Sequence, residues 1–78
     1  MNKDVIVYST PSCPYCIMAK DYFKRNNIPF KDYDVSRDRN KAEEMVRISG
    51  QYGVPVIKIG SKVIIGFNQS EIARALAG

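Results

Sequence analysis

The sequence predicts an α/β domain of order βαβαββα, in which three helices flank a mixed four-stranded sheet. Two observations support this prediction. In the first half of the chain, apolar strand-like runs alternate with helical periodicity, which is typical of parallel βαβ units. In the second half, two short apolar runs are separated by Gly60-Ser61, which is typical of an antiparallel hairpin. With 78 residues, the chain has room for one such sheet, in a single domain predicted over residues 1–78.

The first three elements are predicted from apolar spacing. Residues 4–8 carry a β-branched run that is typical of a central strand buried on both faces. Pro14 suits the first position of a helix, and an apolar stripe continues from there to about residues 26–27. Residues 30–35 mix apolar and charged side chains, which predicts a less buried strand, parallel to the first.

The second half of the chain carries clear start and stop signals. Ser36 is predicted to cap a second helix, in which apolar residues recur at helical spacing until Gly50 ends it. Residues 54–59 and 62–65 are predicted to pair as an antiparallel hairpin. Asn68, with Glu71 three residues later, is a variant capping box that opens the last helix.

Charge and hydropathy exclude several classes of function. The net charge is +4, but the basic residues from Lys3 to Arg74 are interleaved with acids and form no basic block. This pattern is typical of a solvated surface rather than of a nucleic-acid interface. The first apolar run is too short for a signal peptide or a membrane span, so we expect a cytoplasmic protein with no membrane partner. Lys20 is expected at the surface, with a modest role in attracting anionic substrates.

The most informative feature is the motif Cys13-Pro14-Tyr15-Cys16, which contains the only two cysteines of the chain. It follows the first predicted strand and opens the first predicted helix. The unpaired amides of a helix start favour a thiolate on the first cysteine, and a second thiol one turn later can close a disulfide with it. A purely structural disulfide of this spacing would stabilise little through chain entropy. The motif therefore predicts redox chemistry.

The motif, the element order and a Val54-Pro55 pair before the third strand together resemble the glutaredoxin branch of the thioredoxin superfamily, in particular small bacterial glutaredoxin-like proteins. The resemblance covers the whole chain and implies a thioredoxin-like fold. It implies that Cys13 is the nucleophile and Cys16 the resolving thiol. It also implies that Pro55 is a cis proline, with the Val54 backbone beside Cys13 for pairing with substrate.

The same resemblance implies a glutathione site, although two of its anchors differ here. Thr10 stands where glutathione-using members carry a cation, and Ser70 stands where they carry an acid. The remaining candidates are Gln51, the aromatic Tyr15 at the rim, and the segment Gly66, Phe67, Asn68, Gln69 and Ser70, in which Phe67 is expected in the core. The start of the last helix can still bind an anion. Gly66-Phe67 also resembles glutaredoxin-like hydrogen donors that take electrons from thioredoxin reductase.

The predicted function is a thiol-disulfide oxidoreductase with glutathione as co-substrate and no permanently bound cofactor. Its expected partners are disulfide-containing or glutathionylated proteins and either the glutathione reductase or the thioredoxin reductase system. A monomer is expected, with a weak dimer as the alternative. A metal carrier is the competing class, because two thiolates suit Cu(I). The chain has no histidine and no third cysteine, so zinc would require a dimer that shares four thiolates. Copper carriers usually have the order βαββαβ, whereas this chain is predicted to end in ββα, so no metal site is predicted.

Overall fold

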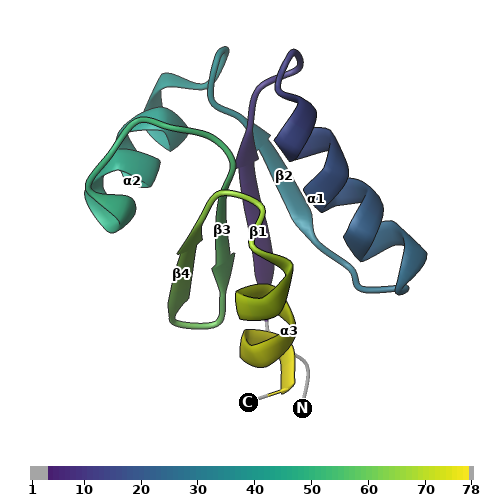
Figure 1. Ribbon diagram of the computed structural model, residues 1–78. Coiled ribbons are helices and arrows are strands. Elements are labelled where there is room, and N and C mark those ends of the chain that lie inside the picture. The colour runs from purple at the N-terminus through teal and green to yellow at the C-terminus, as the bar shows by residue number, and fades with distance from the viewer. Residues whose placement is uncertain (1–3, 78) are drawn as a thin grey trace.

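Figure 1 shows the computed structural model, which describes residues 4–77. Residues 1–3 and Gly78 of the predicted domain lie outside this range. The elements follow one another as β1 (Val5–Ser9), α1 (Pro14–Arg25), β2 (Lys31–Asp34), α2 (Arg39–Ser49), β3 (Val56–Ile59), β4 (Lys62–Ile65) and α3 (Gln69–Ala77). The predicted order is confirmed. The strand boundaries differ by one or two residues from the prediction, since β1 includes Ser9 and β3 begins only after Pro55.

The four strands form one mixed sheet of order β2-β1-β3-β4. β1 is parallel to β2 and antiparallel to β3, and β3 is antiparallel to β4. β1 is therefore central, as predicted, and its residues Val7 and Tyr8 are fully buried. β2 lies at an edge of the sheet and is more exposed than β1, which explains its mixed apolar and charged sequence.

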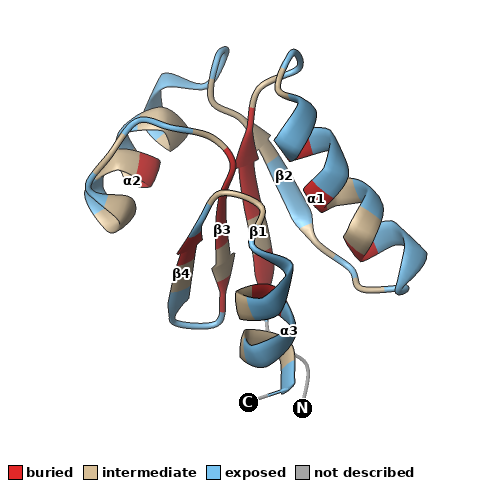
Figure 2. Ribbon diagram, viewed as in Figure 1, coloured by how far each residue is buried: buried red, intermediate tan, exposed pale blue. Residues whose placement is uncertain are grey.

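Alternate residues of the strands build two cores, one on each face of the sheet. On one face, α1 and α3 pack against the sheet through Phe23, Ile57 and Ile72. On the other face, α2 packs through Met45 against Tyr8 and Val56. Figure 2 shows the buried residues concentrated in the central strands and on the inward sides of the helices. The loop before α1 lies at the end of the sheet where β1 terminates (Figure 1).

A polar cluster attaches α2 to its face of the sheet. The Tyr8 hydroxyl donates a hydrogen bond to the Glu44 carboxylate, which also pairs with Lys41 at 3.3 Å. The Lys41 ammonium lies 4.3 Å from the centroid of the Tyr33 ring. Burial, followed by the hydrogen bond to Glu44, raises the pKa of Tyr8, and the hydrogen bond from Tyr8 lowers the pKa of Glu44. This cluster therefore keeps Glu44 ionised and Tyr8 protonated.

The predicted cap of α2 is wrong. Asp38, not Ser36, is the N-cap residue, and its carboxylate accepts a hydrogen bond from the Lys41 amide at 3.1 Å. Ser36 instead donates its hydroxyl to Asp34, within a turn in which the Asp38 amide also bonds to the Asp34 carbonyl at 2.9 Å. Because the Ser36 hydroxyl is bonded within this turn, it does not cap the helix, which begins two residues later than predicted. The predicted end at Gly50 is confirmed, with a left-handed φ of 76°.

We expect Asp38→Ala to lower the free energy of unfolding by about 0.5–2 kcal/mol, because the substitution removes the cap of α2. Ser36→Ala is the matched control and should cost less, since its hydroxyl bonds only within an exposed turn. Urea denaturation followed by circular dichroism measures both. A larger loss for Ser36→Ala than for Asp38→Ala would contradict the assignment of the cap.

The hairpin and the last helix follow the predicted local chemistry. Gly60 has a positive φ of 61° in the turn between β3 and β4. The Asn68 side chain accepts a hydrogen bond from the Glu71 amide at 3.2 Å, which confirms it as a cap of α3. The Glu71 carboxylate pairs with Arg74 at 3.1 Å, so the predicted capping box is present only in its Asn68 half.

Candidate active site

The two thiols of the motif lie at the first turn of α1. Cys13 is the N-cap residue, and its Sγ accepts a hydrogen bond from the Cys16 amide at 3.2 Å. Pro14 occupies the first helical position, as predicted. Cys13 is partly exposed, whereas Cys16 is fully buried, and both are free thiols. One sulfur is thus accessible to a substrate, while the other is shielded behind it.

The surroundings of Cys16 hold it in the thiol form. Burial, followed by the hydrogen bond with Cys13, raises the pKa of Cys16 to about 12. The Thr10 backbone and the charge of Lys20 act in the opposite direction. Since the thiolate is the nucleophile in thiol-disulfide exchange, Cys16 cannot compete with Cys13 for an incoming disulfide at neutral pH.

The loop that precedes β3 lies against Cys13. The Val54-Pro55 peptide is cis, as expected. The Cys13 thiol donates to the Val54 carbonyl, with 3.7 Å between the two atoms. Pro55 is buried, and its carbonyl accepts a hydrogen bond from the Gly66 amide at 2.8 Å. The expected position of Val54 beside Cys13 is confirmed, whereas its pairing with substrate stays a prediction.

The side chain of Gln51 is engaged within its own loop. Its Nε2 donates to the Gly53 carbonyl at 3.0 Å, and its Oε1 accepts from the Gly53 amide at 2.7 Å. A Cβ atom added at Gly53 would lie 2.6 Å from that Oε1, so glycine permits this close contact. The side chain of Gln51 therefore stabilises the loop that leads to Pro55, and binding a ligand would require it to leave these partners.

The segment after β4 lies beside the same loop. Gly66 has a positive φ of 82°, and its amide is bonded to Pro55. Phe67 is partly buried, packing edge-on against Tyr22 at the margin of the core formed with α1 and α3. Asn68 is the cap of α3, while Gln69 and Ser70 are exposed in its first turn. The structure thus places the predicted segment next to the loop of Val54.

Thr10 contacts Cys13 through its backbone, and several large apolar side chains near the predicted site segments in the sequence are exposed. The Thr10 carbonyl accepts a hydrogen bond from the Cys13 amide at 3.3 Å. Tyr15 is 61% exposed, as expected for the rim. Tyr52 and Ile65 are also exposed, at 81% and 54%. Neither residue was predicted as part of the site, although Tyr52 directly follows Gln51 and Ile65 directly precedes Gly66 in the sequence.

Lys20 lies at the surface only in part. Its side chain is only 22% exposed, and its Nζ pairs with the Asp32 carboxylate at 2.9 Å. The other oxygen of Asp32 accepts a hydrogen bond from the buried Ser9 hydroxyl at 2.6 Å. Because Asp32 and Ser9 lie on the α1 face of the sheet, they hold the lysine against that face.

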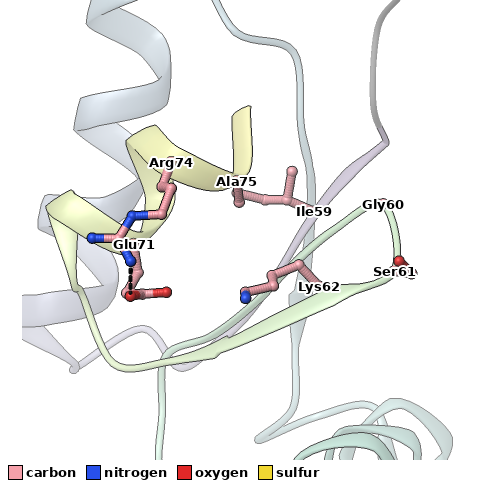
Figure 3. A pocket seen from close by; sticks show the side chains of 7 residues that line it. All are labelled: Ile59, Gly60, Ser61, Lys62, Glu71, Arg74 and Ala75. Atoms are coloured by element: carbon pink, nitrogen blue, oxygen red, sulfur yellow. Dashed lines mark hydrogen bonds and ion pairs between the residues drawn. The ribbon is translucent and has the colours of Figure 1, made fainter. Parts of the chain in front are cut away.

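A cavity of about 350 Å³ lies away from the thiols, between the β3-β4 turn and α3. Figure 3 shows its lining residues, Ile59, Gly60, Ser61, Lys62, Glu71, Arg74 and Ala75. Ile59 pairs with Val5 at the beginning of β1, whereas Cys13 follows the end of that strand. This cavity is therefore at the opposite end of the sheet from the candidate active site.

Within residues 4–77, no group of three or more metal-binding side chains lies close enough together to hold an ion. Within the same residues, no helix is long and apolar enough to cross a membrane.

The fold and the paired thiols define a thiol-disulfide redox protein. A family model described as glutaredoxin matches residues 5–64. A Clostridium pasteurianum protein, described as an uncharacterized glutaredoxin-like 8.6 kDa protein in rubredoxin operon, is 47% identical over 70 residues, which cover 90% of this chain and 93% of that protein. The chain therefore belongs to the glutaredoxin family, as its motif predicts.

Solved structures confirm the thioredoxin-like fold. Glutaredoxin from Archaeoglobus fulgidus superimposes with a TM-score of 0.89 at 26% identity, over 97% of this chain and 88% of that one. The glutaredoxin-like NrdH-redoxin of Escherichia coli, described as having a thioredoxin-like activity profile, superimposes with a TM-score of 0.82 at 25% identity, over 91% and 92% of the two chains. The fold is thus common to a protein described as a glutaredoxin and to one described as having a thioredoxin-like activity profile.

Proposed function

We propose that the protein reduces protein disulfides and glutathione mixed disulfides in the cytoplasm, with glutathione as co-substrate and no permanently bound cofactor. The observation that carries this proposal is the asymmetry of the two thiols. Cys13 is accessible, and its sulfur accepts a hydrogen bond from the Cys16 amide. Cys16 is buried behind it as a thiol. Such a pair suits a nucleophile and a resolving group.

The proposed reaction proceeds in two exchanges. The Cys13 thiolate, stabilised by the Cys16 amide at 3.2 Å, attacks one sulfur of the substrate disulfide and releases the other as a thiolate. Cys16 then loses its proton to water, and its sulfur attacks Cys13. A disulfide forms between the two cysteines, the bond from Cys13 to the substrate breaks, and the substrate leaves as a second thiolate that water protonates. Two molecules of glutathione then reduce the disulfide between Cys13 and Cys16 and are oxidised to glutathione disulfide.

The proposed glutathione site relies mainly on backbone groups. The Val54 backbone is beside Cys13, and the amides that follow Gly66 open α3. Thr10 and Ser70 supply no charge to complement the carboxylate and the amino group of glutathione. Gln51 is already bonded to Gly53. We therefore expect glutathione to bind less tightly than it binds to relatives with charged anchors, since a hydrogen bond to a charged group contributes about 1.5–3 kcal/mol.

We expect Thr10→Lys to lower the apparent KM for glutathione, because the new ammonium can pair with a glutathione carboxylate. The gain should be roughly tenfold, equivalent to about 1.4 kcal/mol, and it should shrink as salt is added. Thr10→Met, which adds length without charge, is the control. Steady-state assays with glutathione and glutathione reductase measure the change. If Thr10→Lys and Thr10→Met behave alike at low salt, the site does not bind glutathione in this way.

A second candidate electron donor is thioredoxin reductase. Two observations favour it: the engagement of Gln51 within its own loop, and the likeness to the NrdH-redoxin of Escherichia coli. Under this alternative the dithiol and its two exchanges are unchanged, and only the source of electrons differs.

A coupled assay distinguishes the two donors. Reduction of a protein disulfide is followed by NADPH oxidation, once with glutathione and glutathione reductase and once with thioredoxin reductase. The proposed function requires turnover with the glutathione system. Rapid turnover with thioredoxin reductase and none with glutathione would assign the protein to the second donor.

We also propose that the protein is a monomer. It should then elute with the mass of one chain in size-exclusion chromatography with light scattering.

A further inference from the structure

The proposed resolving thiol, Cys16, and a partly buried cation, Lys20, lie on the same side of α1. Residues of two strands hold the cation in position. Cys16 and Lys20 are four residues apart in α1, so their side chains lie on the same side of the helix, with Cβ atoms about 6 Å apart. Cys16 is fully buried, and the Lys20 side chain is 22% exposed. The thiol and the ammonium therefore share the interface between α1 and the sheet.

Residues of β1 and β2 determine where the ammonium lies. The Lys20 Nζ is 2.9 Å from Asp32 Oδ2, and the Ser9 hydroxyl bonds to Asp32 Oδ1 at 2.6 Å. Ser9 is 2% exposed and is the last residue of β1, four positions before Cys13. Strand pairing places Asp34 opposite Ser9, and the pKa of Asp34 is lowered mainly by hydrogen bonds from Ser36, with Arg37 and Lys20 contributing least. The cation is thus bonded to a carboxylate of β2 and belongs to the same side of α1 as the Cys16 thiol.

We propose that Lys20, held by Asp32 and Ser9, is a positioning residue that promotes attack by Cys16 on the mixed disulfide at Cys13. This proposal rests on the roles given above to the two cysteines. Lys20 acts through its positive charge and transfers no proton. Its charge stabilises the negative charge that develops on the Cys16 sulfur when the proton leaves to water, in a place where burial opposes that charge.

The charges around Cys16 support this role. Burial has the largest effect on its ionisation, and the groups that follow are Cys13, the Thr10 backbone and Lys20. Once Cys13 is bound to substrate in a mixed disulfide, it carries no thiolate charge to oppose ionisation of Cys16. Lys20 is then the one charged group of those three.

The experiment uses 5,5′-dithiobis(2-nitrobenzoate) with the reduced full-length protein in excess. Attack by Cys13 releases a first thionitrobenzoate, and attack by Cys16 on the resulting mixed disulfide releases a second, at a rate independent of protein concentration. The variants are Lys20→Gln, which keeps a hydrogen-bond donor for Asp32 but no charge, and Lys20→Arg, which keeps the charge. Lys24→Gln is the matched control, an exposed lysine of the same helix that lies about 12 Å from Cys16 along the axis, against about 6 Å for Lys20.

For Lys20→Gln we expect the second release to slow roughly threefold to tenfold and its pH profile to shift to higher pH. The first release should be unchanged, and Lys20→Arg should restore the second. Circular dichroism establishes folding, and Lys20→Met replaces Lys20→Gln if the latter is unfolded. Equal second phases in Lys20→Gln, Lys24→Gln and the unchanged protein would overturn the proposal. So would an equal slowing of both phases. Absence of a concentration-independent second phase in the unchanged protein would instead overturn the roles of the two cysteines.

Discussion

Replacement of Cys13 by serine is expected to abolish the reduction of both protein disulfides and glutathione mixed disulfides, with a loss of at least about a thousandfold in kcat/KM. The reason is that both reactions begin with attack by the accessible sulfur at the start of α1. Cys16 cannot replace it, because Cys16 is fully buried and its pKa is raised to about 12. The coupled assay with each type of substrate measures the loss.

Alkylation provides an independent measurement of the same asymmetry. Below about pH 9, iodoacetamide should modify Cys13 well before Cys16, because the raised pKa leaves Cys16 almost entirely as a thiol. Mass spectrometry of peptides from partially alkylated protein gives the ratio. The assignment of the nucleophile is wrong if Cys16 is alkylated faster, or if Cys13→Ser retains turnover.

Replacement of Cys16 by serine is expected to separate the two activities. The variant should keep most of its activity toward small glutathione mixed disulfides, because free glutathione can resolve the intermediate on Cys13. Its reduction of protein disulfides should fall at least on the order of a hundredfold, since an internal thiol is replaced by one from solution. The Cys16 amide that bonds to Cys13 belongs to the backbone and is retained in the variant.

The control for this second variant is the first phase of the reaction with 5,5′-dithiobis(2-nitrobenzoate). Its rate should match that of the unchanged protein, which shows that the nucleophile is intact, while the second, concentration-independent phase disappears. A trapped mixed disulfide on Cys13 should accumulate with a protein substrate and be visible by non-reducing electrophoresis. Equal loss of both activities would contradict the division of roles.

Much of the fold follows from local patterns in the sequence. The order of elements, the helix start at Pro14, the stop at Gly50 and the cap at Asn68 depend on residues within about one helical turn of each other. The cap of α2 is the exception. Ser36 and Asp38 are both acceptable caps by residue type, and the turn formed with Asp34 selects the second.

The sequence by itself determined the chemistry of the site, because two thiols three residues apart at a helix start carry that information locally. The placement of Val54 beside Cys13 joins residues 41 positions apart; the family resemblance implied it, and the spacing of residues could not. Only the tertiary structure decided that Lys20 is held against Asp32, which lies on another element 12 residues away. Local sequence specifies which groups are available, but burial and pairing depend on which segments the packed sheet brings together.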